Sequence, residues 1–150
     1  MATTCKDDSL SVSRKCNTTG LVLTKIRQRI LSILVDSSVP LSAYDIVSVY
    51  KEVYAENIQA MTVYRVLDYL SNADLTHRLN YNNKYVSCSH LSCCDEHGMS
   101  QFFICTKCNK VHESPLDDAI IALIQRHASD IGHEVVTPHL EVEGICESCR

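Results

Sequence analysis

Two pairs of cysteines with C-x-x-C spacing lie in the last third of the chain, Cys105 with Cys108 and Cys146 with Cys149. Together they supply four thiolates, the number that a closed tetrahedral zinc site requires. Thiolates favour zinc over hard cations such as magnesium, and a site of this kind contributes directly to folding. A thioredoxin-type redox pair is the alternative, but neither pair has the strand-to-helix context that lowers a thiol pKa. We therefore expect a structural zinc that joins the two ends of a small subdomain.

A second group of metal-binding side chains is more dispersed along the sequence: His77, Cys88, His97 and Glu113. One thiolate, two imidazoles and a carboxylate are sufficient for a second tetrahedral zinc site. Several neighbours of His97 are alternative ligands, namely His90, Cys93, Cys94, Asp95 and Glu96. The two groups together predict two zinc ions per chain.

Three helices and a hairpin are predicted to position the first part of this set. Thr24 and Ser42 are expected to cap the first two helices, with Asp45 completing a capping box. Apolar residues at helical spacing define each buried face; in the third helix, from about 61 to 72, they are Val63, Val66, Leu67 and Leu70. Two short extended runs, 75–79 and 84–88, flank a turn-prone Asn80–Asn83 segment. This order is typical of a winged helix-turn-helix.

The third helix is the best candidate for reading DNA. Tyr64 and Arg65 project away from its apolar stripe, and arginine can donate two hydrogen bonds to guanine O6 and N7. Arg27 and Tyr44, near the starts of the two preceding helices, are candidates for contacts with phosphates or base edges. A solvated helix face, with Arg27 and Tyr44 as packing residues, is the alternative reading.

The second half of the chain predicts a small α/β unit. Strands are expected around 102–105, 111–113 and 135–142, and the last of them leads to Cys146. A helix from about 116 to 131 should bury Ile120, Ile121, Leu123 and Ile124 and end at Gly132. The predicted fold class is therefore α+β, with a flexible arm at 1–20, a winged-helix domain at 21–83 and a second, metal-binding domain at 84–150.

Three segments resemble the ferric uptake regulator family: Leu-Ser-Ala-Tyr-Asp at 41–45, Thr-Val-Tyr-Arg-Val-Leu-Asp at 62–68 and Phe-Ile-Cys-Thr-Lys-Cys at 103–108. The resemblance covers about residues 21–149 and is greatest to the zinc-sensing branch. It implies a dimeric winged-helix repressor with a C-terminal α/β dimerisation domain, a structural zinc and a regulatory metal near the hinge. It also implies base contacts from Tyr44, Tyr64 and Arg65, a structural zinc on the four paired cysteines, and a regulatory zinc on His77, Cys88 and Glu113, with His97 matching after a small shift in register.

The choice of metal follows from which ligands the chain carries. Iron-sensing members of the family usually have an H-x-H cluster before the first cysteine pair, where this chain has Ser100, Gln101, Phe102 and Phe103. A site that contains the Cys88 thiolate is better suited to zinc. We therefore expect a zinc-responsive repressor of zinc-uptake genes that binds an operator of dyad symmetry as a homodimer. An iron, manganese or peroxide sensor on the same scaffold is the alternative.

Bulk composition narrows the other possibilities. The chain has 150 residues, of which 45% are hydrophobic, and a net charge of -4, with more acidic residues in its second half than in its first. It lacks the combined H-x-E and P-C-x-x-C signature of zinc deaminases and the H-E-x-x-H motif of zinc proteases, so we expect neither an enzyme nor a small-molecule substrate. An interaction module without DNA binding is a further alternative. Without a signal-peptide pattern or a long apolar run, the sequence predicts a cytoplasmic protein that does not enter the membrane.

Overall fold

The computed structural model describes residues 22–89, 99–136 and 139–150, which belong to two compact units, Met1–Asp95 and Glu96–Arg150. The predicted arm at 1–20 lies outside the described residues. The division falls later than the boundary at 83/84 that we expected from the sequence. The reason is that the second strand of the hairpin pairs with the first, and so belongs to the first unit.

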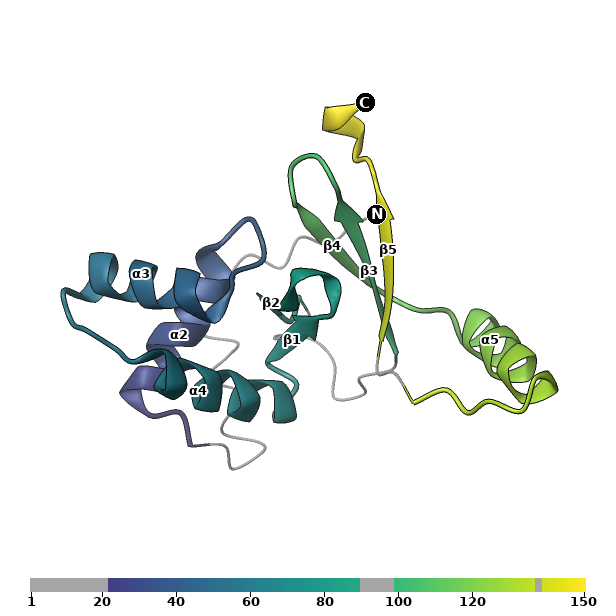
Figure 1. Cartoon of the computed structure of the whole chain (residues 1–150), viewed down its shortest axis with the longest axis horizontal. Coiled ribbons are helices and arrows are strands. Elements are labelled where there is room, and N and C mark those ends of the chain that lie inside the picture. The colour runs from purple at the N-terminus through teal and green to yellow at the C-terminus, as the bar shows by residue number, and fades with distance from the viewer. Residues whose placement is uncertain (1–21, 90–98, 137–138) are drawn as a thin grey trace. The chain divides into compact units, whose positions relative to one another are not determined.

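The first unit contains three helices, α2 (Lys25–Asp36), α3 (Ala43–Tyr54) and α4 (Ala60–Asn72), as Figure 1 shows. Thr24 caps α2 by accepting a hydrogen bond from the backbone N–H of Arg27. Ser42 and Asp45 form the expected reciprocal capping box at the start of α3. These bonds satisfy backbone donors that have no partner inside a helix, and they therefore fix where both helices begin.

The apolar stripes of the three helices meet in one hydrophobic core. Ile30, Ile46, Val63, Leu67 and Leu70 are all fully buried there. Helical spacing was sufficient to predict these positions, because residues three and four apart share one face of a helix. The core holds α4 by one side and leaves its opposite side exposed.

A two-stranded antiparallel sheet, β1 (Thr76–Leu79) and β2 (Lys84–Ser87), follows α4 as the predicted hairpin. The turn between the strands includes Asn82 and Asn83 with positive φ angles of 60° and 50°, a conformation that asparagine tolerates better than most residues. Tyr85 and Leu41 exchange two backbone hydrogen bonds of 2.8 and 3.0 Å. The hairpin is thereby attached to the segment that leads into α3.

The second unit contains a three-stranded sheet of β3 (Ser100–Cys105), β4 (Val111–Pro115) and β5 (His139–Gly144), in the order β4-β3-β5. β4 is antiparallel to β3, whereas β5 is parallel to it and pairs Cys105 with Gly144. Parallel pairing places the carboxyl ends of β3 and β5 at the same edge. Each of these two ends carries one of the cysteine pairs.

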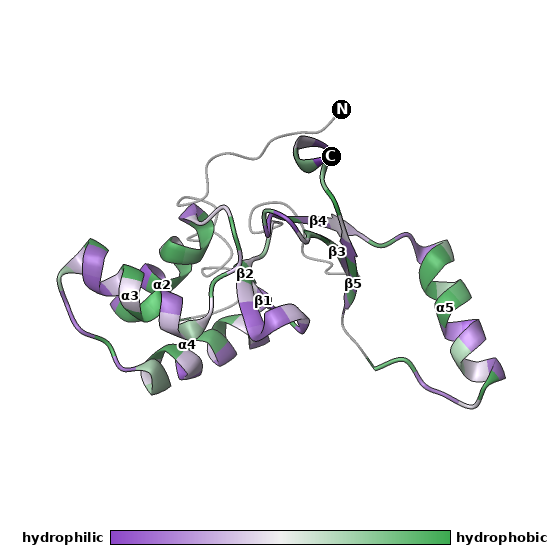
Figure 2. Ribbon diagram, turned by 45° about the horizontal axis from the view of Figure 1, so that its top comes forward, coloured by the Kyte–Doolittle hydropathy of each residue, from purple (hydrophilic) through white to green (hydrophobic). Residues whose placement is uncertain are grey.

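The helix of the second unit, α5 (Asp118–Asp130), corrects one expectation. Its helical period is confirmed, and Gly132 follows it with a positive φ of 74°. However, none of its residues is buried, although we expected Ile120, Ile121, Leu123 and Ile124 to be. Figure 2 shows hydrophobic residues concentrated in its first half. Helical spacing reveals an apolar face but not what covers it.

The last predicted strand also begins later than expected, at His139 rather than Val135. Within the described residues, no helix is both long enough and apolar enough to span a membrane.

Candidate metal and DNA-binding sites

The four paired cysteines come together at one end of the sheet. Cys105 ends β3, Cys108 lies in the turn before β4, and Cys146 and Cys149 follow β5. Their sulfur atoms all lie within 4.8 Å of one another, and Cys108 Sγ is 3.7 Å from Cys146 Sγ. Zn–S bonds of about 2.3 Å in a tetrahedron place sulfurs roughly 3.8 Å apart, whereas a disulfide requires about 2.05 Å. The geometry therefore fits four zinc-binding thiolates, and these cysteines form no disulfide.

Hydrogen bonds at this cluster favour charge on one sulfur and oppose it on another. Backbone N–H groups, first that of Cys146 and then those of Cys108 and Lys107, lower the pKa of Cys105 to about 6. Hydrogen bonding to the thiols of Cys146 and Cys108 raises the pKa of Cys149 to about 12. Four neighbouring thiolates repel one another unless a cation compensates their charge, and a bound dication provides that compensation.

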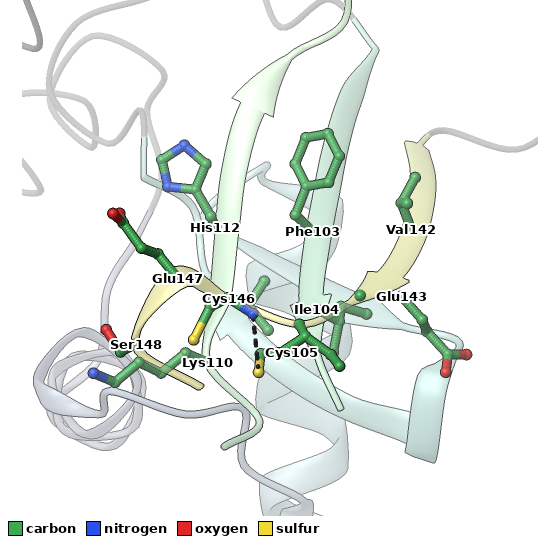
Figure 3. A pocket seen from close by; sticks show the side chains of 13 residues that line it. Phe103, Ile104, Cys105, Lys110, His112, Val142, Glu143, Cys146, Glu147 and Ser148 are labelled. Atoms are coloured by element: carbon green, nitrogen blue, oxygen red, sulfur yellow. Dashed lines mark hydrogen bonds between the residues drawn. The ribbon is translucent and has the colours of Figure 1, made fainter. Parts of the chain in front are cut away.

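A hollow of ≈450 Å³ lies beside the cysteines, on one face of the sheet (Figure 3). Phe103, His112 and Val142 pair across the three strands and point to this same face. Phe103 keeps 44% of its surface exposed although it lies in the central strand. This face is thus partly apolar, through Phe103 and Val142, and it is uncovered within the described part of the chain.

The hairpin of the first unit brings together two members of the second metal-binding group. His77 lies opposite Val86, and Cys88 continues the ladder by donating its N–H to Leu75 O at 3.0 Å. Residues two apart on a strand share a face, so Cys88 lies on the face of His77 and Val86. The ligand atoms of His77 and Cys88 lie within 4.8 Å of each other, and Cys88 is buried.

The remaining two members of this group belong to other parts of the chain. Glu113 lies on β4 of the second unit, half-buried, where Ser100 Oγ donates a 3.1 Å hydrogen bond to its Oε1. His97 and its proposed substitutes between 90 and 96 lie outside the described residues. The hairpin therefore contributes one thiolate and one imidazole, which is a nitrogen and sulfur donor pair.

The exposed side of α4 carries the predicted DNA-reading residues. Tyr64 and Arg65 lie on a stripe with Met61 and Asp68, at positions i, i+3, i+4 and i+7, and all four are exposed. The opposite stripe is anchored in the core, so the backbone of α4 is held firmly behind these side chains. Our sequence reasoning missed Met61 as a member of this face, although the same spacing would have identified it.

The other two candidates differ in how they are held. Tyr44, in the first turn of α3, is 67% exposed. Arg27 is half-buried: its guanidinium carbon lies 3.4 Å from the centre of the Tyr69 ring, and its Nη1 donates to Val22 O at 2.7 Å. Tyr44 is thus accessible from solvent, whereas Arg27 already uses one face of its guanidinium group within the protein.

Comparison with known proteins agrees with this architecture. The model of the ferric uptake regulator family matches residues 18–143. The chain belongs to the ferric uptake regulator family. This family member is 28% identical to the zinc uptake regulation protein of Escherichia coli (strain K12) over an alignment of 150 residues, which covers 98% of this chain and 84% of that protein.

Two solved structures extend the comparison. The crystal structure of holo XcZur has 30% sequence identity and a TM-score of 0.78, with 95% of this chain and 98% of that chain covered. A zinc uptake regulator complexed with zinc and DNA has 25% identity and the same TM-score, covering 93% and 91%. This family member is therefore a DNA-binding, metal-responsive transcriptional regulator and not an enzyme, and its α+β winged-helix fold is confirmed.

Proposed function

We propose that this regulator is a cytoplasmic, zinc-responsive repressor of zinc-uptake genes. It binds operator DNA as a homodimer when a second, regulatory zinc ion is bound. The observation that carries the proposal is the pairing of the Cys88 thiolate with the His77 imidazole on one face of the hairpin. Iron and manganese sensors use nitrogen and oxygen ligands, whereas a thiolate ligand favours zinc. The relatives named for zinc uptake support the same choice.

Two zinc ions per chain are proposed, with different roles. The four paired cysteines would hold one ion permanently, because all four ligands belong to the same unit. His77, Cys88, Glu113 and His97 would hold the other, because their donor atoms together complete a tetrahedral set. When bound, this second ion compensates the Cys88 charge and holds ligands that come from both units.

The residues of the chain then couple zinc to DNA. Because ligands of the second group lie in both units, their zinc affinity depends on how the units are arranged. A hundredfold preference for the DNA-competent arrangement corresponds to about 2.7 kcal/mol. The α4 helices of two copies would enter successive major grooves of an operator with dyad symmetry.

Dimerisation is supported by apolar surface that the described residues of one chain leave uncovered. On the sheet, Phe103 and Val142 are exposed, and on α5 Leu123 is 47% exposed. An uncovered apolar face on a helix and on a sheet is typical of a subunit interface. We therefore propose that the second unit pairs two chains, as expected from the family resemblance.

Metal counting and DNA binding with Cys88→Ser test the proposed metal. We expect about two zinc ions in the wild type and about one in the variant, with loss of tight DNA binding. Ser87→Ala, which alters the adjacent residue on the other face of the strand, should keep two zinc ions and normal binding. Unchanged zinc content in Cys88→Ser would refute the second site, and DNA binding activated by iron but not by zinc would favour the alternative sensor.

Substitution of the DNA-reading residues tests the proposed DNA contacts. Arg65→Ala should lose about 1–3 kcal/mol of binding free energy and relax preference at one base pair. Tyr44→Phe and Tyr64→Phe test whether the two hydroxyl groups contribute to the affinity for DNA. Arg27→Lys tests whether the part of the Arg27 guanidinium group that Tyr69 leaves uncovered contacts a phosphate. Arg126→Ala removes the same charge from α5 and serves as the control. Equal losses for Arg65→Ala and Arg126→Ala would show that general charge, rather than base reading, explains the effect.

A further inference from the structure

Met61 is an apolar side chain placed among the polar residues of a DNA-reading surface. It lies in the first turn of α4 and is 62% exposed. It is not among the hydrophobic residues that pack against the core of the first unit. Since single exposed hydrophobic residues are common, its exposure alone does not indicate a role.

Its position on the helix provides the second argument. Met61 precedes Tyr64 by three residues and Arg65 by four, so the three side chains share one face of α4. In helix-turn-helix proteins the residues near the start of the recognition helix contact base edges. In that docking mode Met61 lies in the part of α4 that contacts base edges.

We propose that Met61 reads the 5-methyl group of a thymine in the operator. The thymine methyl is the apolar feature that base pairs present in the major groove, and apolar side chains recognise it by direct contact. A methionine side chain has no hydrogen-bonding group strong enough to read a donor or acceptor, and its flexible thioether adapts to a methyl-sized partner. This inference rests on the proposed function, and it adds a specificity residue that the polar contacts of Arg65 and Tyr64 do not supply.

The test uses DNA that differs by one methyl group. Duplexes are first selected from a random library by the wild-type protein with zinc, and each thymine is then replaced singly by deoxyuridine, which removes the methyl alone. Burial of one methyl corresponds to about a fourfold change in affinity. In the wild type we expect that loss at one thymine in each half-site.

Three variants assign the effect to Met61. Met61→Ala should bind the unmodified duplex about fourfold more weakly, with no further loss on deoxyuridine at that thymine. Met61→Gln, similar in length but polar, should also lose the sensitivity to the methyl group. Val53→Ala is the matched control, because Val53 is also 62% exposed but lies at the end of α3. It should retain the wild-type response.

The possible results separate this inference from the proposed function. If wild type and Met61→Ala respond equally to deoxyuridine at every thymine, or if the selected sites share no thymine, Met61 does not read a methyl group. If the wild type selects no sequence in the presence of zinc, the proposed function fails and the inference fails with it. Circular dichroism of each variant verifies that α4 is intact, since alanine and glutamine both favour helices.

Discussion

Replacing Cys108 by serine should unfold the second unit while leaving the first folded. Three large hydrophobic side chains are buried among the described residues of the second unit, Phe102, Ile104 and Leu116. At about 1.5–3 kcal/mol each, they contribute roughly 5–9 kcal/mol to folding. A structural zinc in a small domain contributes about 10–16 kcal/mol. The proposed zinc is thus the larger stabilising term, and it is comparable to the whole stability of about 5–15 kcal/mol that is usual for a domain.

Hydrogen exchange followed by mass spectrometry on the full chain measures this effect unit by unit. In Cys108→Ser the amides of β3 and β5 should lose their protection, because the sulfur 3.7 Å from Cys146 is gone and the zinc leaves with it. The amides of α2, α3 and α4 should keep theirs, since their core is formed within the first unit. Metal counting on the same samples verifies that zinc has been lost.

Cys88→Ser is the matched control, because it makes the same cysteine-to-serine change at the buried Cys88, which follows the hairpin of the first unit. We expect β3 and β5 to remain protected in that variant. If Cys108→Ser loses zinc and yet β3 and β5 exchange as slowly as in the wild type, the reasoning is wrong and the sheet is stable on its own packing.

Three further predictions concern the first unit, each measured by urea denaturation of the full chain. Ser42→Ala should cost about 1 kcal/mol of stability by removing the helix cap. Hydrogen bonds from the Ser42 backbone and side chain lower the pKa of Asp45, so their contribution to stability is fully present above the ordinary Asp pKa of about 3.9 and is lost as the pH falls through the lowered value. The stability difference between the variant and the wild type should therefore be smaller in acid. Ala55→Gly should stabilise the protein by about 0.5–1 kcal/mol, because Ala55 ends α3 with a positive φ of 54° that glycine adopts more easily. Glu52→Gly, inside the same helix, should instead destabilise it by about 1 kcal/mol. If the two substitutions changed the free energy of unfolding equally, Ala55 would not be a strained position. Leu67→Ala should cost about 2–5 kcal/mol, since Leu67 is fully buried in the core, and a loss below about 1 kcal/mol would contradict that packing.

The local signals in the sequence predicted the first unit well. Thr24 and Ser42 are caps within four residues of the groups they bind, and the apolar stripe of α4 needs nothing beyond helical spacing. Such features depend on neighbours in the chain and can be read from it directly. The pairing of His77 and Cys88 also follows from a short hairpin, whose turn fixes the register.

Features that depend on distant residues were not predictable in the same way. Arg27 packs one face of its guanidinium group on Tyr69, which lies far along the chain. Arg29 similarly joins α2 to Glu56, at 2.7 Å, and to the Tyr50 hydroxyl, at 2.9 Å. A sequence pattern shows that such a side chain is long and charged, and not which group it reaches. The same limit explains why the apolar face of α5 was wrongly expected to be buried.

The two cysteine-containing groups differ in how their ligands are distributed, and this difference decides which of them can act as a switch. The four paired cysteines are brought together by the parallel pairing of β3 with β5, so whatever binds them stabilises the second unit in every state of the protein. A ligand that stabilises two states equally shifts no equilibrium between them, however tightly it binds. In the proposed regulatory group His77 and Cys88 belong to the hairpin and Glu113 to β4, so an ion bound by all three would favour one arrangement of the units over another. We therefore propose that the dispersed group senses zinc and that the four paired cysteines serve folding.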